Sequence, residues 1–338
     1  HVLSPLILLV PHTPQGYLNL FWICAGCCAF NLIMLMILFK DIPTDVNKDA
    51  NPLDVLFKTI VNIFEIRLLA WLVIMSAFWM MMYQLWDAQP NFIQDWIDRA
   101  SLAGTWPLKM WAETGEDGIA RVPQQVLISL NSLLIIFFVV PISHMVRKFR
   151  SLTAMIGGML VVTIGVLVAG SSQTAWILLV GISLFSLGEM LVGPKKSEYL
   201  ALIAPPGKKA LYLGYVVIPT GVGRGVGNWF SGWLYGEVGE KASLSLRYLV
   251  EKTPMGADLN WDGKMSSLEK TTGVPLTDAF AKLQEVTGMT ANDATQMLWN
   301  TYNPQYWFWL PFVAIGIVAT IALFIFGQMA KKWADMNA

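Results

Sequence analysis

Charged side chains are scarce in this chain of 338 residues. Asp, Glu, Lys and Arg make up 14% of it, and its formal net charge is zero. A soluble domain carries about 25% charged residues, so this composition argues against a soluble protein. A neutral chain also offers no electrostatic basis for binding nucleic acid. The partner that we expect from composition is the lipid bilayer.

Cysteine and histidine are also rare, with three residues of each. Cys24, Cys27 and Cys28 lie together in an apolar run with no histidine or acid beside them. Free cysteine behaves as a small apolar residue, so packing explains this cluster better than a redox or metal site. The sequence shows no nucleophile, metal cluster or acid pair typical of an enzyme. We therefore expect a protein that is not an enzyme and whose main function needs no cofactor.

Apolar residues dominate instead, at 55% of the chain, with 15 Trp and 17 Met. About 20 consecutive apolar residues suffice to cross a bilayer as a helix. The long apolar runs predict about seven full transmembrane helices, and hence an all-α polytopic membrane protein. The runs are residues 17–39, 68–86, 123–146, 152–169, 176–204, 211–238 and 306–329.

The order of the runs predicts a domain organisation. The chain starts with His1 directly before an apolar segment. We therefore expect residues 1–40 to end an N-terminal helix bundle whose earlier part is missing. Residues 41–67 would be a cytoplasmic linker with an amphipathic helix at the membrane interface. Six spans follow in residues 68–238 plus 306–332, as in the second half of a transporter built from two six-helix repeats. Residues 239–305 would form a small extracytoplasmic α insert.

Basic residues indicate the orientation. Basic turns at residues 147–150 and 208–209 and the pair at 331–332 fall on one side if the spans alternate. Lys and Arg are enriched in cytoplasmic loops, so we expect a cytoplasmic C-terminus and residues 239–305 outside. We expect the membrane to be the cell (inner) membrane.

Two charged residues lie near the middle of predicted spans. Glu189 interrupts the run 176–204, where a charge costs about 2.5–3.5 kcal/mol on insertion scales and commonly marks function. Such a carboxyl group could take up and release a proton during transport. The alternative is a structural acid neutralised by a partner, for example Arg224 in the next span. Arg224 itself either pairs with Glu189 or faces the transport pathway as counter-ion to an anionic group.

Lys195 and Lys196 follow in the cytoplasmic part of the same span, with Glu198. Long basic side chains commonly extend to the membrane interface, and we expect that here. Lining the inner exit of the pathway is the alternative.

Four sequence strings resemble one known family. They are FWMMMYQ (78–84), NFIQDWIDR (91–99), SLNSLLIIFFVVP (129–141) and LGEMLVGP (187–194). They are similar to the seventh helix, the segment after it, and the eighth and tenth helices of the proton-dependent oligopeptide transporters of the major facilitator superfamily. The corresponding helix strings of that family run approximately FWxxxEQ, SLNPxFIxxxxP and LGExxLSP. The resemblance covers most of the membrane part after residue 68 and implies a major-facilitator-type helix bundle.

The resemblance also implies roles for single residues. Glu189 would be the tenth-helix carboxylate that meets the substrate's amino terminus or a lysine from the other half of the transporter. Asn131 would be the eighth-helix amide near the substrate carboxylate, and Gln84 would line the seventh-helix wall. Tyr83 stands where the family usually has a glutamate, which departs from its pattern of proton coupling. The implied function is proton-coupled symport of di- or tripeptides or similar small solutes. The alternatives are a carrier of another, possibly anionic, organic solute and a calcium-responsive membrane receptor.

The predicted insert contains a second motif. DLNWDGKMSSLE (258–269) satisfies the pattern of an EF-hand calcium loop, D-x-[DN]-x-[DN]-G-x5-E. Pro254 and Gly256 exclude a long entering helix, so we expect an EF-hand-like loop with a structural Ca²⁺ rather than a sensor; a solvated acidic loop is the alternative. The expected ligands are Asp258, Asn260, Asp262, Lys264 through its carbonyl, Ser266 and Glu269. Residues 276–299 beyond it predict two short amphipathic helices, the second capped by Thr290.

Overall fold

The computed structural model describes residues 14–38, 60–115, 117–257 and 259–330. The predicted start of the chain, most of the linker at 41–67 with its interfacial helix, and the basic pair at 331–332 lie outside the described residues.

Long helices make up most of the described chain, as the apolar runs predicted. Six of them are long and apolar enough to cross a membrane, judged by length and composition. They are α2 (Pro14–Leu38), α4 (Ile66–Met82) with its short continuation α5 (Gln84–Asp87), α7 (Gln124–Val146), α8 (Ser151–Gly170), α9 (Ala175–Ile203) and α16 (Pro304–Ala330). This confirms the all-α membrane class.

The predicted span over residues 211–238 is divided. The structure has α10 (Lys209–Tyr215), α11 (Ile218–Leu234) and a single π-helical turn, η3 (Tyr235–Gly239). Pro219 lies in the first turn of α11. A proline ring clashes with the carbonyl four residues earlier and lacks an N–H, so α10 ends at Tyr215 and α11 starts anew. The described residues therefore contain six candidate spans instead of seven.

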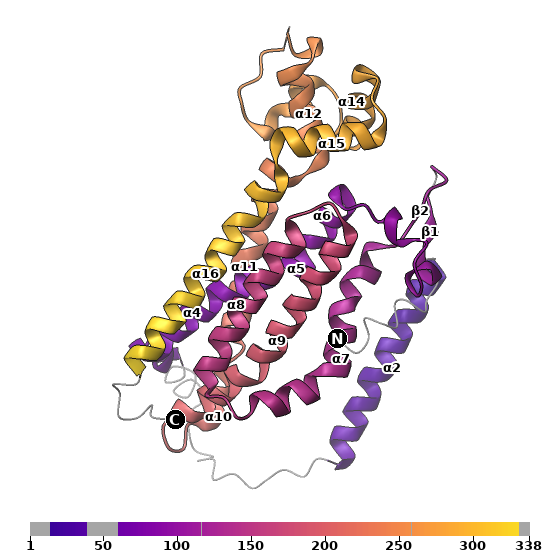
Figure 1. Ribbon diagram of the computed structural model, residues 1–338. Coiled ribbons are helices and arrows are strands. Elements are labelled where there is room, and N and C mark those ends of the chain that lie inside the picture. The colour runs from indigo at the N-terminus through magenta and orange to yellow at the C-terminus, as the bar shows by residue number, and fades with distance from the viewer. Residues whose placement is uncertain (1–13, 39–59, 116, 258, 331–338) are drawn as a thin grey trace.

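Two regions outside the long helices fold into short elements. Between α5 and α7 lie α6 (Gln89–Trp96), η1 (Ala100–Leu102), η2 (Leu108–Trp111) and the antiparallel pair β1 (Glu113–Thr114) and β2 (Ala120–Arg121). Between η3 and α16 lie α12 (Lys241–Lys252), η4 (Pro254–Gly256), η5 (Met265–Ser267), α13 (Leu268–Thr272), η6 (Leu276–Asp278), α14 (Ala279–Thr287) and α15 (Ala291–Tyr302). This second region forms a small helical cap on one end of the bundle, which we call the insert (Figure 1).

The insert contains the two helices predicted at residues 276–299, α14 and α15. The predicted cap is also confirmed, because the Thr290 side chain accepts a hydrogen bond from the backbone N–H of Asp293 at 3.3 Å. Such a cap satisfies one of the amide groups that has no acceptor within a helix.

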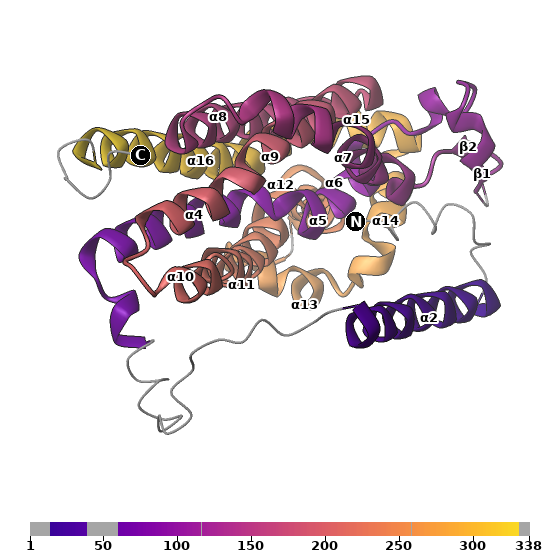
Figure 2. The same ribbon diagram turned by 90° about the horizontal axis from the view of Figure 1, so that it is seen from below.

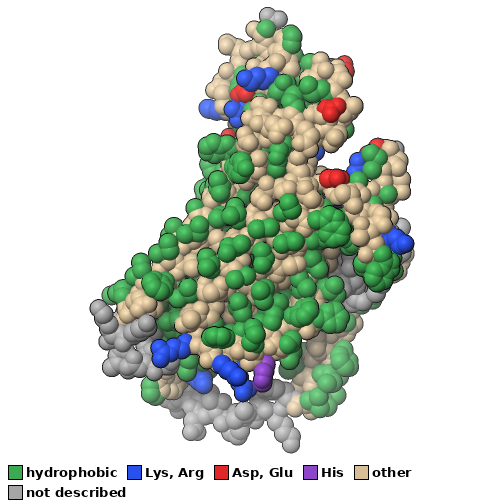
Figure 3. All heavy atoms as spheres, viewed as in Figure 1, with side chains coloured by type: hydrophobic (Ala, Val, Ile, Leu, Met, Phe, Trp, Pro, Cys, Tyr) green, Lys and Arg blue, Asp and Glu red, His purple; other side chains and the backbone are tan. Residues whose placement is uncertain are grey.

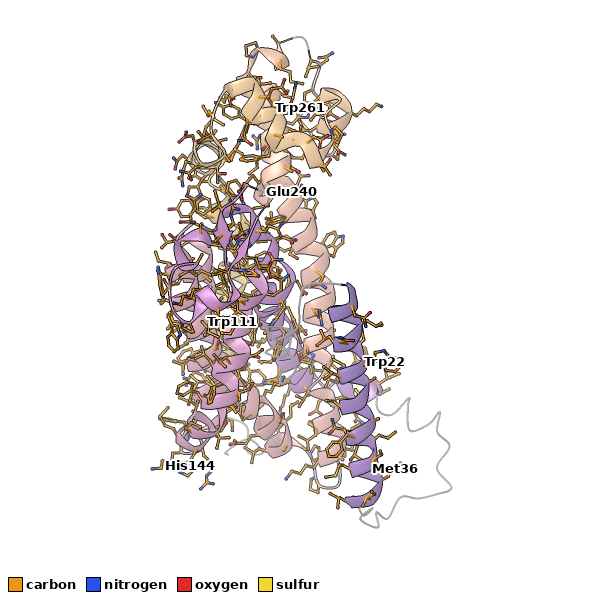
Figure 4. All side chains as sticks on the ribbon, turned by 90° about the vertical axis from the view of Figure 1, so that its right-hand side faces the viewer. Trp22, Met36, Trp111, His144, Glu240 and Trp261 are labelled. Carbon is orange, nitrogen blue, oxygen red and sulfur yellow. The ribbon has the colours of Figure 1, made fainter. Side chains whose placement is uncertain are left out.

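Buried contacts attach the insert to the bundle. The Tyr235 hydroxyl donates to the Asp95 carboxylate at 2.6 Å, and the Trp96 ring N–H donates to the Gly239 carbonyl at 2.7 Å. The backbone N–H of Lys241 adds a bond of 3.3 Å to Asp95. Burial raises the pKa of Asp95, and the bonds from Tyr235 and Lys241 oppose that shift. Glu240 marks this junction in Figure 4, with Trp261 far out on the insert and His144 at the opposite end.

The long helices pack in two layers, which Figure 2 shows from below. α8, α9 and α16 lie in one layer, and α4, α10 and α11 lie in the other. α4 contacts α11, α8 and α16, while α7 packs against α9. α2 stands apart from this bundle, and none of its apolar window is buried.

α8 and α9 make the most extensive contact of the bundle, and glycines allow it. A Cβ added at Gly188 of α9 would lie 2.6 Å from the carbonyl oxygen of Gly158 of α8. One at Gly165 would meet the backbone of Phe185 at 2.5 Å. Small residues let membrane helices approach closely, so these positions set the distance between the two helices.

The surface agrees with a membrane environment. Apolar side chains cover the sides of the bundle in Figure 3, while acidic side chains gather toward the insert and basic ones also appear at the opposite end. Both described basic turns, α7–α8 and α9–α10, lie at the end opposite the insert.

Gly188→Ala should destabilise the bundle by about 1–3 kcal/mol, the usual cost of overpacking. The added methyl group would overlap backbone atoms of α8, which cannot move aside as a side chain can. Thermal unfolding in detergent measures the effect. Gly193→Ala in the same helix is the matched control, because nothing lies within 4 Å of its added Cβ. Equal melting temperatures for the two variants would contradict the close contact.

Candidate functional site

Glu189 and Asn131, both predicted site residues, form a direct contact. The Asn131 side-chain N–H donates to Glu189 Oε2 at 2.9 Å and lies 3.0 Å from Ser186 Oγ. Asn131 is fully buried on α7, and Glu189 is partly buried on α9. Gly188 packs against α8, and the next residue is turned by about 100° around the helix. The α8–α9 contact therefore directs Glu189 away from α8.

Lys196 supplies a positive charge near this pair. It lies seven residues after Glu189, two turns along the same face of α9, and the two charges attract each other. The Lys196 ammonium lies 4.1 Å from the centroid of the Trp79 ring on α4, which is a favourable cation–π distance. The ammonium is therefore held inside the bundle, as in the pathway-lining alternative for Lys196.

Arg224 of α11 pairs with Asp87 of α5, and not with Glu189. Its Nη2 lies 3.4 Å from Asp87 Oδ1, and its guanidinium carbon lies 5.1 Å from the centre of the Tyr83 ring. The Asn228 amide, with its nitrogen assigned to the side facing Asp87, also donates to that carboxylate. The Arg224 side chain stays 55% exposed against 15% for Asp87, so much of its guanidinium remains open to a ligand.

Tyr83 and Gln84 lie where α4 meets α5. The Tyr83 ring lies between Trp79 and Trp86, with 5.7 Å to each ring centre. Gln84 is fully buried, donates to the Met80 carbonyl at 2.8 Å, and faces Gly227 of α11. Tyr83 thus contacts Arg224, whereas Gln84 lies in the contact between α4 and α11.

The expectation that Lys195 extends to the interface is wrong. Only 2% of its surface is exposed. Its ammonium donates to the Phe149 carbonyl at 3.0 Å and to the Glu198 carboxylate at 2.9 Å, and Ser151 donates to the same carboxylate at 2.8 Å. A buried ammonium needs such partners, and the turn between α7 and α8 supplies them. This cluster fastens that turn to α9.

Sequence reasoning missed Asp87, Asn228 and Ser186 as parts of the site. Asp87 is 137 residues from Arg224, and only the packing of α11 on α4 and α5 brings them together. Ser186 gave a weak signal, because it precedes Glu189 by three residues and so shares its helix face.

The EF-hand-like loop has part of the expected geometry. Gly263 adopts φ +80°, the left-handed conformation that a sharp turn requires. Asp262 Oδ1 accepts from the backbone N–H of Lys264 at 3.0 Å and from the Ser267 hydroxyl. Asp262 is exposed, and these two hydrogen bonds lower the pKa of its carboxyl group. The carboxylate therefore stays ionised, as calcium binding requires.

Other features of the loop depart from a calcium site. Glu269 Oε1 accepts the backbone N–H of Leu276 at 2.7 Å, which turns that oxygen toward η6. The described residues contain no group of three or more His, Cys, Asp or Glu that could hold a metal ion. Asp258 lies outside the described residues. Asn260 and Ser266 are exposed. The structure thus brings only some of the expected calcium ligands together, and calcium binding stays a prediction.

Comparison with known proteins bears on the whole bundle. Residues 91–248 match the family described as Major Facilitator Superfamily. The chain is 26% identical over 168 residues to the "Uncharacterized MFS-type transporter YttB" of Bacillus subtilis (strain 168), covering 49% of this chain and 42% of that protein. It is 27% identical over 106 residues to "Multidrug resistance protein MdtH" of Blochmanniella floridana, covering 31% of this chain and 26% of that protein. No solved structure matches.

These matches support the major facilitator superfamily. The described residues form a helical membrane bundle that is consistent with the predicted major-facilitator type. The first relative is named as a transporter and the second as a multidrug resistance protein. The long apolar helices of the described residues support an integral membrane protein. The chain spans less than half the length of each of these relatives. The finer assignment to the oligopeptide transporters stays a prediction.

Calcium should raise the melting temperature of the parent protein, because a ligand that binds only the folded state stabilises it. Replacing Asp258 and Glu269 together by Ala should abolish that rise. The matched control replaces Asp278 and Glu285, acids of the same insert outside the loop. A parent protein whose melting temperature does not respond to roughly millimolar calcium, the range of weak extracellular sites, would rule out the site.

Proposed function

We propose that this protein is a secondary active transporter that moves a small solute by alternating access and is driven by protons. The observation that carries the proposal is the contact between Glu189 and Asn131 inside the membrane bundle. A carboxylate in a membrane span is costly and commonly belongs to a substrate or proton pathway. We further propose that the C-terminus is cytoplasmic, that the insert is outside, and that the membrane is the cell (inner) membrane.

Glu189 has the surroundings that proton coupling needs. The Asn131 amide and the Lys196 ammonium both stabilise the ionised carboxylate. Protonation removes the charge, which weakens both interactions at once. Lys196 is then free to pair with another anionic group, such as a substrate carboxylate or an acid of the N-terminal helix bundle. Uptake of a proton is in this way linked to a rearrangement around α9.

The bundle contains one acidic and one basic candidate contact, which suit a zwitterionic solute. Glu189 with Asn131 can meet an ammonium group, and the exposed part of Arg224 can meet a carboxylate. Asp87 and Tyr83 hold the Arg224 guanidinium in place without covering it. A di- or tripeptide carries both groups. The second candidate is a small organic anion, which Arg224 alone favours.

Glu189→Gln should abolish proton-driven uptake, because the amide keeps the shape of the side chain but cannot exchange a proton. The measurement is accumulation of labelled dialanine by proteoliposomes that contain the complete polypeptide, under an inward proton gradient. Glu285→Gln, the same change at an exposed position of the insert, should leave uptake unchanged. Gradient-dependent uptake by Glu189→Gln at the parent rate would refute the coupling role.

Arg224→Gln should raise the KM for dialanine by about tenfold, the usual effect of losing a hydrogen bond between charged groups. It should change the KM for dialaninamide, which lacks the carboxylate, much less. Arg247→Gln is the matched control, since Arg247 also pairs with an acid, Glu251 at 2.8 Å, but lies in the insert. Equal effects on both peptides would exclude the carboxylate contact. Accumulation of succinate without dialanine would favour the anion carrier.

A further inference from the structure

A cavity separate from Glu189 and Arg224 opens at the end of the bundle that carries the insert. It has a volume of about 370 Å³ and lies between α6, the β1–β2 hairpin and the first turn of α7. Two arginines, Arg99 and Arg121, line it together with the polar side chains of Thr114, Gln124 and Gln125. The hairpin is seen beside α6 in Figure 1. The lining is polar, with two arginines and one acid, Glu113, unlike the apolar sides of the bundle.

Arg99 faces another arginine across this region. Its Nη1 makes a long hydrogen bond of 3.5 Å to the Val122 carbonyl, and it forms no ion pair with any residue that the structure describes. Burial and the nearby charge of Arg121 lower the pKa of Arg99, but arginine stays charged at neutral pH. A half-buried guanidinium with one long hydrogen bond keeps most of its five N–H donors for a bound anion.

Arg121 is fixed in place by an acid of the hairpin. Its two terminal nitrogens lie 2.9 and 2.6 Å from the two carboxylate oxygens of Asp117. This pairing lowers the pKa of Asp117 to about 2, so the pair persists at any physiological pH. A guanidinium carries five N–H donors, and the pairing with Asp117 uses only part of them. Arg121 is thus a positioned donor with capacity left for a ligand.

The start of α7 adds a third positive element. α7 begins directly after Pro123, and Gln124 and Gln125 in its first turn line the cavity. The first N–H groups of a helix have no acceptor within it, and the helix dipole places partial positive charge there. α7 has 23 residues, long enough for its dipole to be fully developed. The helix end and the arginines therefore act on the same cavity.

We propose that this cavity binds a phosphate group. Guanidinium forks match phosphate oxygens in pairs, and helix N-termini bind phosphate through backbone N–H groups. Donors that approach from several sides suit a tetrahedral group with oxygens in all directions. A planar carboxylate would be satisfied by Arg99 alone. Glu113 is the one acidic side chain among the described lining residues, so the two arginines outnumber it.

Two sources can supply this phosphate: a soluble phosphate compound and a phospholipid headgroup. Apolar side chains of the same connection bear on the choice, since Trp106 is 73% exposed and Met110 is 67% exposed. Tryptophan is enriched at membrane–water interfaces, and basic pockets near the membrane bind lipid headgroups. The two sources share one chemistry at Arg99 and differ in whether the ligand stays with the membrane.

The first arm of the test uses inorganic phosphate and the purified complete protein in detergent at low ionic strength. Calorimetric titration should detect phosphate binding, and Arg99→Gln should weaken it at least about tenfold. Arg99→Lys should weaken it less, because it keeps the charge but loses the fork. Arg147→Gln, in the basic turn at the other end, is the control. Parent protein that binds no phosphate, or binds it as tightly after Arg99→Gln, would overturn the proposal.

The second arm repeats the titration in nanodiscs. If free phosphate binds equally in phosphatidylcholine and phosphatidylglycerol discs, the site takes a soluble compound. If phosphatidylglycerol abolishes phosphate binding for the parent, the headgroup occupies the site. Native mass spectrometry should then show more retained phosphatidylglycerol on the parent than on Arg99→Gln. Retention that is equal for the two proteins would overturn the lipid form of the proposal. Neither arm of the test measures uptake, so the phosphate-site proposal can fail or succeed independently of the proposed transport function.

Discussion

The close contact between α8 and α9 is the constraint on which the candidate site depends. Gly158 and Gly188 let the two backbones meet at a distance that excludes even a methyl group. The backbone of α9 is thereby fixed at the residue before Glu189, in a lipid environment that supplies little hydrophobic force between helices. Packing on one face of α9 thus sets the direction of a charged group on another face.

A second glycine contact serves the other charged pair. Gly223 and Gly227 of α11 lie against the backbone and side chains of α4 and α5, and Arg224 follows Gly223 as Glu189 follows Gly188. Glu189 and Arg224 are therefore each preceded by a glycine that packs its helix against a neighbour. The charges of Glu189 and Arg224 are balanced separately, by Lys196 and by Asp87. Such separate balance allows one pair to change its protonation without forcing the other to break.

The sequence predicted most of the fold for physical reasons that are local. Apolar runs define spans because a bilayer demands about 20 apolar residues, and Thr290 was recognisable as a cap from its own neighbourhood. The sequence did not predict the break before α11, although it contains Pro219. A glycine-rich apolar segment has the hydropathy of a continuous span. Glu189 was visible as an acid in the middle of an apolar span, Asn131 came from a family resemblance, and the structure brings them together. Asp87 and the burial of Lys195 needed tertiary packing, since their partners come from distant helices or from a turn whose position no local pattern reveals.

The junction below the insert has a practical consequence. Asp95 receives bonds from Tyr235 and Lys241, and the ring of Trp96 is bonded to Gly239 and packs against Trp299 of α15. These contacts attach the insert to α6 at the end of the bundle, so we expect the insert and the bundle to move together. A fluorophore or an antibody fragment placed on the insert would follow each tilt of these helices from outside the lipid. The same projection would serve as a landmark for aligning single-particle images of an otherwise smooth membrane protein.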